Sequence, residues 1–215
     1  MWAWSTFCSS RLSLVRFWTL ASLMSALAML VAGPSNALTA KQKRRLCYPR
    51  GSVTKLVTRE ARIYAPNDPN ALDSELDACL FATGRSRLLD SFDEQYSDVT
   101  EYKLAGRFVA WDYFSVPSCK NACPPGVTGT ERVSVMDLRS GRTRSVTTSA
   151  SIIGLTPRGT LVWIGPDPAG QAVMAIDARG QRVLDSGDIK PGFLKVFGTL
   201  VLWRKAGEGR WVDLA

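Results

Sequence analysis

The segment GRFVAWDY, at Gly106–Tyr113, decides the fold class because similar segments recur along the chain. Two close copies are GTLVWIG from Gly159 and GTLVLWRK from Gly198, and ARIYAP from Ala61 is a weaker fourth member with Tyr64 in the aromatic place. The close copies begin with a glycine and continue as a β-rich run that ends around tryptophan. Runs of this composition, bounded by glycine and turn residues, indicate β-strands.

The segments on either side of these runs repeat as well. Each run is preceded by a short apolar strand that leads into a tight turn, in the order VTKLVTRE, EYKLAG, SIIGLTPRG and FLKVFG. The first three runs are followed by a strand, a glycine turn at Gly84, Gly141 or Gly180, and another strand. The last copy stops after GRWVDLA. Each unit is therefore predicted to have four short antiparallel strands, with the fourth missing from the last unit.

Four-stranded units at this spacing predict an all-β, β-propeller-like fold of about four units, the last one incomplete. The steps between the aromatic positions are 47, 52 and 40 residues. No segment after the N-terminal apolar run has a helical period, and Asn70–Leu80, where a helical turn is plausible, is expected to link two strands. One way to close the ring is for Arg44–Gly51 to pair beside the last strand and supply its missing neighbour. The alternatives are an open stack of sheets, a β-sandwich, or an oligomer that shares the edge.

The pattern LAGRFVAW followed by VSVMDLRSGR resembles the blades of bacterial secreted propellers. Over Cys47–Ala215 the chain is similar to uncharacterised exported bacterial β-propeller-like repeat proteins. The usual signature dipeptide of WD40 blades is absent at the matching places, so that subfamily is not indicated. The resemblance implies a fold and assigns no site residues, because its motifs describe strands and turns.

The first 37 residues are typical of a secretory signal peptide. Arg11 and Arg16 precede an apolar run without charge, from Phe17 to Gly33, and small residues follow it. This order predicts cleavage after Ala37, with Ala40 as the alternative site. The expected organisation is a signal peptide at 1–37 and a β-propeller-like domain at 38–215, located in the cell envelope or outside the cell.

An uncleaved membrane anchor at residues 17–33 is the alternative. Seventeen apolar residues lie at the short limit for a spanning helix. Lys41, Lys43, Arg44 and Arg45 follow closely, and by the positive-inside rule they would keep the remaining chain in the cytoplasm.

Charge is unevenly distributed in the expected mature chain, whose net charge is +6 once the two basic residues of the signal are removed. Residues 41–62 carry eight basic residues against one acid, whereas residues 63–101 carry nine acids against two arginines. The two regions are expected to attract each other. Alternatively, the basic arm could hold phospholipid headgroups, a cell-wall polymer or nucleic acid. The sequence argues against nucleic acid because no recognition helix or RNA-binding aromatic motif surrounds the basic residues.

Four cysteines remain after cleavage, which predicts two disulfides in an exported chain. Spacing pairs Cys119 with Cys123 in PSCKNACPPG, at Pro117–Gly126, and elimination then pairs Cys47 with Cys79. Structural zinc needs four ligands, usually as two close pairs, but only one close pair exists and the chain has no histidine. Three residues separate Cys119 from Cys123, where thioredoxin-like pairs have two. We therefore expect a stapled loop.

No residue of the sequence is selected as catalytic, cofactor-binding or metal-binding. The absence of histidine excludes Ser-His-Asp hydrolases. LDSG at Leu184–Gly187 resembles one catalytic loop of the aspartic proteases, which need two, so we expect an ordinary strand end and turn. The acidic run at Leu89–Glu101 lacks the spacing of an EF-hand and is expected to be a solvated connection. Carboxylate pairs for glycoside hydrolysis are not selected by spacing.

The tryptophans at Trp111, Trp163 and Trp203 are expected in the apolar core, whereas the place of Trp211 is undecided. The sequence thus predicts an exported, non-enzymatic binding or scaffold module of the cell envelope or exterior. The expected partner is a protein or an envelope polymer of unknown identity, and the oligomeric state is unspecified. The alternative is an exported carboxylate-dependent enzyme, such as a glycoside-active propeller.

Overall fold

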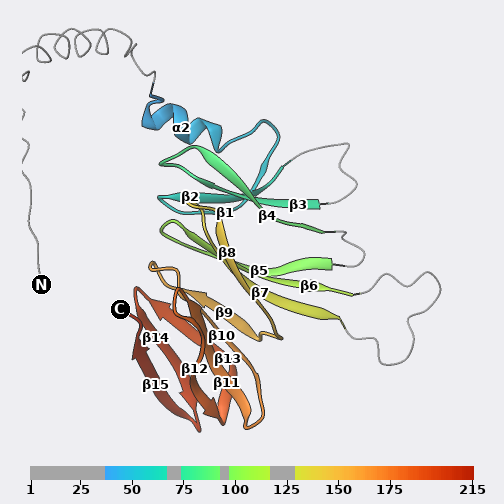
Figure 1. The fold of residues 1–215 in the computed structure, drawn as a ribbon, viewed down its shortest axis with the longest axis vertical. Coiled ribbons are helices and arrows are strands. Elements are labelled where there is room, and N and C mark those ends of the chain that lie inside the picture. Colours follow the sequence, from blue (N-terminus) through green and yellow to red (C-terminus); the bar gives the residue numbers. More distant parts are fainter. Residues whose placement is uncertain (1–36, 67–73, 93–96, 117–128) are drawn as a thin grey trace, which may run out of the picture. The chain divides into compact units, whose positions relative to one another are not determined.

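A computed structural model of the protein describes residues 37–66, 74–92, 97–116 and 129–215. The chain divides into two units, Met1–Leu38 and Thr39–Ala215. In the second unit, the described residues form one helix and four antiparallel sheets (Figure 1). The prediction of an all-β, propeller-like fold with four units and an incomplete last unit is confirmed. Among the described residues no helix is long and apolar enough to cross a bilayer; the apolar run at 17–33 lies outside them.

Neighbouring strands in each sheet are also neighbours in the chain. Sheet A contains β1 (Val53–Val57), β2 (Ala61–Ala65), β3 (Ser74–Leu80) and β4 (Arg85–Phe92). Sheet B contains β5 (Ser97–Ala105), β6 (Phe108–Ser115), β7 (Thr130–Asp137) and β8 (Arg142–Thr147). Sheet C contains β9 (Ile152–Leu155), β10 (Leu161–Asp167), β11 (Gly170–Asp177) and β12 (Gly180–Gly187). Sheet D contains β13 (Ile189–Phe197), β14 (Leu200–Lys205) and β15 (Glu208–Asp213).

The sheets pack on one another in chain order, with their first strands together. Strand β5 contacts β1, β9 contacts β5, and β13 contacts β9. Side chains of Leu104, Ile153 and Leu194, from three successive first strands, line a small cavity of about 250 Å³. First strands that gather along a common line are the arrangement of propeller blades.

The ring-closing prediction for Arg44–Gly51 is wrong. Residues Ala40–Leu46 form the helix α2, and β15 is paired only with β14 in the described sheet D. The Thr39 hydroxyl accepts a hydrogen bond from the Gln42 backbone, and the Gln42 side chain accepts one from the Thr39 backbone. This capping box satisfies two otherwise unpaired donors and starts the helix. The helix lies against the β3–β4 turn, where a Cβ on Gly84 would stand only 2.8 Å from the Lys43 carbonyl oxygen.

The stretch Asn70–Leu80 is described from Ser74 onward, and there it forms strand β3. The helical turn considered for this stretch is therefore absent over residues 74–80. Sheet pairing explains the outcome, because Ala78 lies opposite Ile63 and both side chains are fully buried in the core between sheets A and B.

The segment after α2 covers the face of sheet A that points away from sheet B. Cys47 is joined to Cys79 of β3 by a disulfide with a Cα–Cα distance of 5.4 Å. The Arg62 side chain is 1% exposed, and it donates hydrogen bonds to the Cys47 carbonyl oxygen at 2.7 Å and the Thr54 hydroxyl at 2.8 Å. The other expected disulfide, Cys119 with Cys123, lies outside the described residues and stays a prediction.

The tryptophan of each second strand packs toward the preceding sheet. Trp111, Trp163 and Trp203 are at most 4% exposed, and they belong to the cores between sheets A and B, B and C, and C and D. Tyr64 has the same place in sheet A and packs on Cys47 of the N-terminal cover. The predicted core positions are confirmed. Trp211, by contrast, is 68% exposed.

Two of the three sheet junctions contain the same partly buried hydrogen bond from an indole to a carboxylate. The Asp90 carboxylate of β4 accepts one from the Trp111 indole at 3.0 Å, and the Asp185 carboxylate of β12 accepts one from the Trp203 indole at 2.9 Å. A cation joins each pair, Arg132 at 2.6 Å from Asp90 and Lys205 at 2.7 Å from Asp185. We call each such group a tie, because it joins the last strand of one sheet to the next sheet.

Among the described residues, the junction between sheets B and C has no tie. The register of β4 and of β12 shifts beside the tie aspartate. Strand β8 instead pairs with β7 without a shift, and near the position of the tie aspartate it carries the exposed Thr147. The Trp163 indole nitrogen is buried and has no hydrogen-bond partner in the described part of the chain. The segment Leu184–Gly187, expected to be a strand end and turn, lies wholly within β12 and supplies the second tie.

The ties predict a specific loss of stability. We expect Asp185→Ala and Asp90→Ala each to lower the free energy of unfolding by about 1–3 kcal/mol, because an indole N–H and a cation lose their acceptor. Thr147→Ala is the matched control and should change the free energy of unfolding by less than about 0.5 kcal/mol. Urea denaturation at neutral pH measures all three, and an equal loss in the control would contradict the assignment.

Candidate functional site

The hairpin turns place the ends of the sheets on two opposite faces. In an antiparallel meander, the turns after the first and third strands lie at one end and the turn after the second strand lies at the other. We call the first end the turn face and the opposite end the connection face. A cleft opens on each of them.

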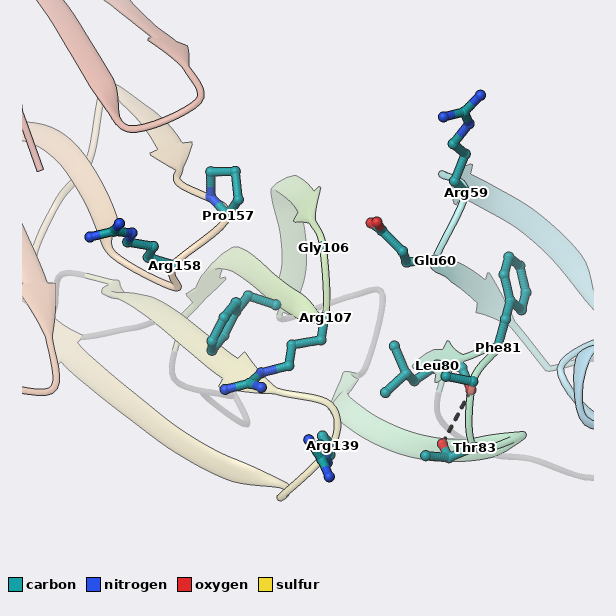
Figure 2. Close-up of a pocket in the computed structure, with 12 residues that line it drawn as sticks. Arg59, Glu60, Leu80, Phe81, Thr83, Gly106, Arg107, Arg139, Pro157 and Arg158 are labelled. Carbon is teal, nitrogen blue, oxygen red and sulfur yellow. Dashed lines mark hydrogen bonds between the residues drawn. The ribbon is translucent and has the colours of Figure 1, made fainter. Parts of the chain in front are cut away.

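The cleft on the turn face, here the arginine cleft, measures about 890 Å³ and is lined by turns from three sheets. Figure 2 shows Glu60 on the β1–β2 turn, Phe81 on the β3–β4 turn, Arg107 on the β5–β6 turn and Arg158 on the β9–β10 turn. The turns can approach closely because Gly159 leaves room for the Phe108 ring, which would lie 2.5 Å from a Cβ at that position. Gly159 also has a φ of +82°, a conformation that glycine adopts without strain.

Positive charge dominates this cleft. Four arginines line it, Arg59, Arg107, Arg139 and Arg158, against one acid, Glu60. Arg107 is paired with Asp137 at 3.3 Å. The guanidinium groups of the other three make no ion pair with a described residue, and all three residues are exposed.

Guanidinium groups bind carboxylate and phosphate oxygens through paired N–H donors. In Figure 2 the Arg59, Arg139 and Arg158 side chains stand at separate places around the rim and point in different directions. They do not converge on one point, as they would for a single small anion. The arrangement suits an extended ligand with several negative groups.

The cleft on the connection face, here the carboxylate cleft, measures about 720 Å³ and lies between sheets B and C. Three acids line it, Glu101 of β5, Asp112 of β6 and Glu131 of β7. Their convergence follows from the strand register: Glu101 is paired with Asp112, and Glu131 is paired with Phe114, two residues further along β6. Residues at these spacings lie on one face of a sheet.

The partners of the three acids differ. Glu101 is fully engaged, because it forms an ion pair with Lys103 at 2.6 Å and accepts a hydrogen bond from the Ile153 backbone at 2.9 Å. One Asp112 oxygen accepts a hydrogen bond from the Thr100 hydroxyl at 2.9 Å. The other Asp112 oxygen, Oδ1, and Glu131 Oε2 are buried without a hydrogen-bond partner among the described residues.

Asp112 occupies a place that sheet C fills with an apolar side chain. It follows Trp111 in β6 as Ile164 follows Trp163 in β10, and Ile164 is fully buried between sheets C and D. The Asp112 side chain is 7% exposed. Burial raises its pKa and the charges of Glu131 and Glu101 raise it further, although the Thr100 hydrogen bond acts in the opposite direction. A carboxylate kept in such a place costs stability, which is characteristic of functional sites.

Neither cleft was selected from the sequence, which predicted no catalytic, cofactor-binding or metal-binding residue. The described residues contain no group of three His, Cys, Asp or Glu side chains arranged to hold a metal ion. The run Leu89–Glu101 ends β4 and begins β5, and residues 93–96 between them lie outside the description. No ion pair joins described residues of the basic region 41–62 to the acidic region 63–101, so the expected attraction has no direct contact in this part of the chain.

Neither family models nor curated proteins match this sequence. Solved structures that resemble the chain include a prolyl endopeptidase, with a TM-score of 0.44, 14% identity and coverage of 92% of this chain and 34% of that one. They also include the β-propeller domain of the Trilobed protease from Pyrococcus furiosus, with a TM-score of 0.42, 11% identity and coverage of 74% and 53%. Hydrazine synthase of Kuenenia stuttgartiensis has a TM-score of 0.39, 10% identity and coverage of 73% and 56%. The chain thus spans about a third to just over half of these solved chains, and none of their activities is transferred to it.

The buried carboxylate at Asp112 gives a pH-dependent prediction. The pKa of Asp112 is raised in the folded protein above the unfolded value near 3.8. The ionised side chain therefore lowers the free energy of unfolding, and this loss develops as pH rises through the two pKa values. Asp112→Asn should therefore be more stable than the unaltered chain at pH 7, by about 0.5–2 kcal/mol, with a smaller difference at pH 4. Urea denaturation at both pH values measures this, with exposed Glu208→Gln as the control. A less stable Asp112→Asn protein at pH 7 would contradict the interpretation.

Proposed function

We propose that the chain is an exported, non-enzymatic binding module of the cell envelope or exterior, and that its arginine cleft binds an anionic polymer. The observation that supports this most is the set of three exposed guanidinium groups without described ion-pair partners, carried by turns of sheets A, B and C. An acidic polymer of the envelope offers carboxylate or phosphate groups at repeated intervals. Such a ligand can engage several separated arginines at once, which raises its affinity above that of any single contact.

The N-terminal sequence and the disulfide support export. Disulfides persist in oxidising compartments, and the Cys47–Cys79 bond holds the N-terminal cover on sheet A. A cytoplasmic domain behind an uncleaved anchor would keep these thiols reduced.

Mass analysis of the protein isolated from its native host tests export. We expect a mature chain that begins at Leu38, with non-reducing peptide mapping that joins Cys47 to Cys79 and Cys119 to Cys123. A chain that retains residues 17–33 and has Cys47, Cys79, Cys119 and Cys123 as free thiols would support the membrane-anchored alternative instead. A mapped bond from Cys119 or Cys123 to either of the other cysteines would contradict the predicted pairing.

Removal of cleft charge tests the polymer-binding role. Combined replacement of Arg59, Arg139 and Arg158 by Gln should weaken binding to a glycerol-phosphate polymer or a polyuronic acid at least about tenfold, equivalent to about 1.4 kcal/mol. Binding of the unaltered chain should also weaken as salt is raised from about 50 to 500 mM, because the contacts are exposed. Biolayer interferometry with immobilised polymer measures both effects, and neutral dextran serves as the negative ligand.

The matched control removes the same charge elsewhere. Arg50, Arg204 and Arg210 are exposed and do not line the arginine cleft, so their combined replacement by Gln should leave binding within about twofold. Equal losses of polymer binding in the two triple variants would show that binding depends on the net charge of the protein and not on the arginine cleft. No binding of the unaltered chain to either anionic polymer would overturn the proposal.

The second candidate is a carboxylate-dependent enzyme, such as a glycoside-active propeller. The raised pKa of Asp112 beside Glu131 favours it, since paired carboxyl groups with different environments can serve as acid and base. We rank it second because both side chains project from the same face of sheet B, whereas glycosidase carboxylates flank the bond that is cleaved. Release of reducing sugar by the unaltered chain, abolished in Glu131→Gln, would favour the enzyme.

A further inference from the structure

We infer that the carboxylate cleft is a binding site for a protonated primary amine on an alkyl chain. The site is separate from the arginine cleft, because it lies on the connection face and shares no lining residue with it. The inference depends on two buried carboxylate oxygens without described partners, Asp112 Oδ1 and Glu131 Oε2.

The unpaired oxygens require donors. A buried acceptor without a hydrogen bond costs about 1–3 kcal/mol, and a charged one costs more. Asp112 is only 7% exposed, and one of its two carboxylate oxygens already accepts a hydrogen bond from the Thr100 hydroxyl. The side chain is therefore fixed, with its second oxygen left for a ligand.

The chemistry of the lining selects an N–H cation over a metal ion. Calcium needs six to eight oxygen ligands, whereas the described residues contain no group of three suited to metal. Glu101 contributes no free oxygen, because Lys103 and the Ile153 backbone already engage it. Two acceptors on one wall match an ammonium group, which carries three donors on a compact charge.

The rest of the lining suits the alkyl part of the ligand. Phe114 lies beside the carboxylates on the same face of β6. Ala150, ahead of β9, and Ile152, the first residue of β9, also line the cleft. Methylene groups bury favourably on such surfaces. An aromatic ring near an ammonium adds a cation–π attraction. A lysine side chain or a free alkyl diamine has both parts.

Comparison with the other sheet junctions supports a ligand role for these acids. At the A–B and C–D junctions, Asp90 and Asp185 are each satisfied by an indole and a cation of the protein. At the B–C junction no described cation reaches Asp112 or Glu131. Asp112 and Glu131 lie on β6 and β7 rather than at the tie position of β8, and an amine ligand would give them the kind of cation that the tie aspartates receive from the chain.

Calorimetric and NMR titration of the full mature chain tests the inference. The probes are 1,5-diaminopentane and N-acetyl-lysine-N-methylamide at pH 7.5, with tetramethylammonium as a cation of equal charge that has no N–H. We expect saturable binding of at least one amine, with shifts of the Asp112 and Glu131 carboxyl carbons, and at least about tenfold weaker binding of tetramethylammonium. Stronger binding of the lysine derivative would identify a protein lysine as the source, and stronger binding of the diamine would identify a free amine.

Variants of equal charge locate the site. Asp112→Asn and Glu131→Gln should each weaken amine binding at least about tenfold. Glu208→Gln removes the same charge from an exposed place outside the cleft and should stay within about twofold. Circular dichroism and urea denaturation establish that each variant is folded. Three outcomes would overturn the inference: equal effects of all three variants, equal binding of tetramethylammonium, or tighter binding of calcium than of either amine.

Discussion

Each sheet of this protein has to bury a face against a neighbour, and the rest of the structure depends on that constraint. The second strand of every sheet meets it in the same way, with an aromatic side chain toward the preceding sheet. Sheet A has no preceding sheet in the described unit, and the segment after α2 takes that place. Its disulfide at Cys47 and the buried Arg62 guanidinium hold this cover against Tyr64. The far side of sheet D exposes Phe197 and Trp211, at 63% and 68%.

The strands and turns could be predicted from the sequence because they depend on local patterns. A glycine turn followed by alternating apolar residues fixes both a strand and its two faces, so the burial of Trp111, Trp163 and Trp203 followed directly. Helix α2 could not be found from periodicity, since seven residues make fewer than two turns. Its available signal was local, the Thr39 and Gln42 pair of a capping box. The role of Asp185 was missed because it depends on an irregular register in β12 that no local pattern announces.

The two clefts could not be predicted from local sequence patterns, for a different reason. Asp112 meets Glu101 only through the pairing of β5 with β6, and the arginine cleft needs turns from three sheets to lie together. One signal was nevertheless present. A strand with neighbours on both faces should be apolar on both, and the aspartate directly after Trp111 breaks that rule where the third sheet has Ile164. Polar residues at core positions of a repeat therefore mark candidate sites that can be sought in the sequence.

The missing tie between sheets B and C has a mechanical consequence. The ties join A to B and C to D, so the described residues form two tied pairs of sheets that meet at one seam. Besides apolar packing, a hydrogen bond from the Ile153 backbone to Glu101, a residue of the carboxylate cleft, joins described residues across that seam. The cleft also includes Gly192 of β13, so its walls belong to both pairs. A ligand bound in this cleft would contact both pairs of sheets, so it would add a link across the junction that lacks a tie among the described residues.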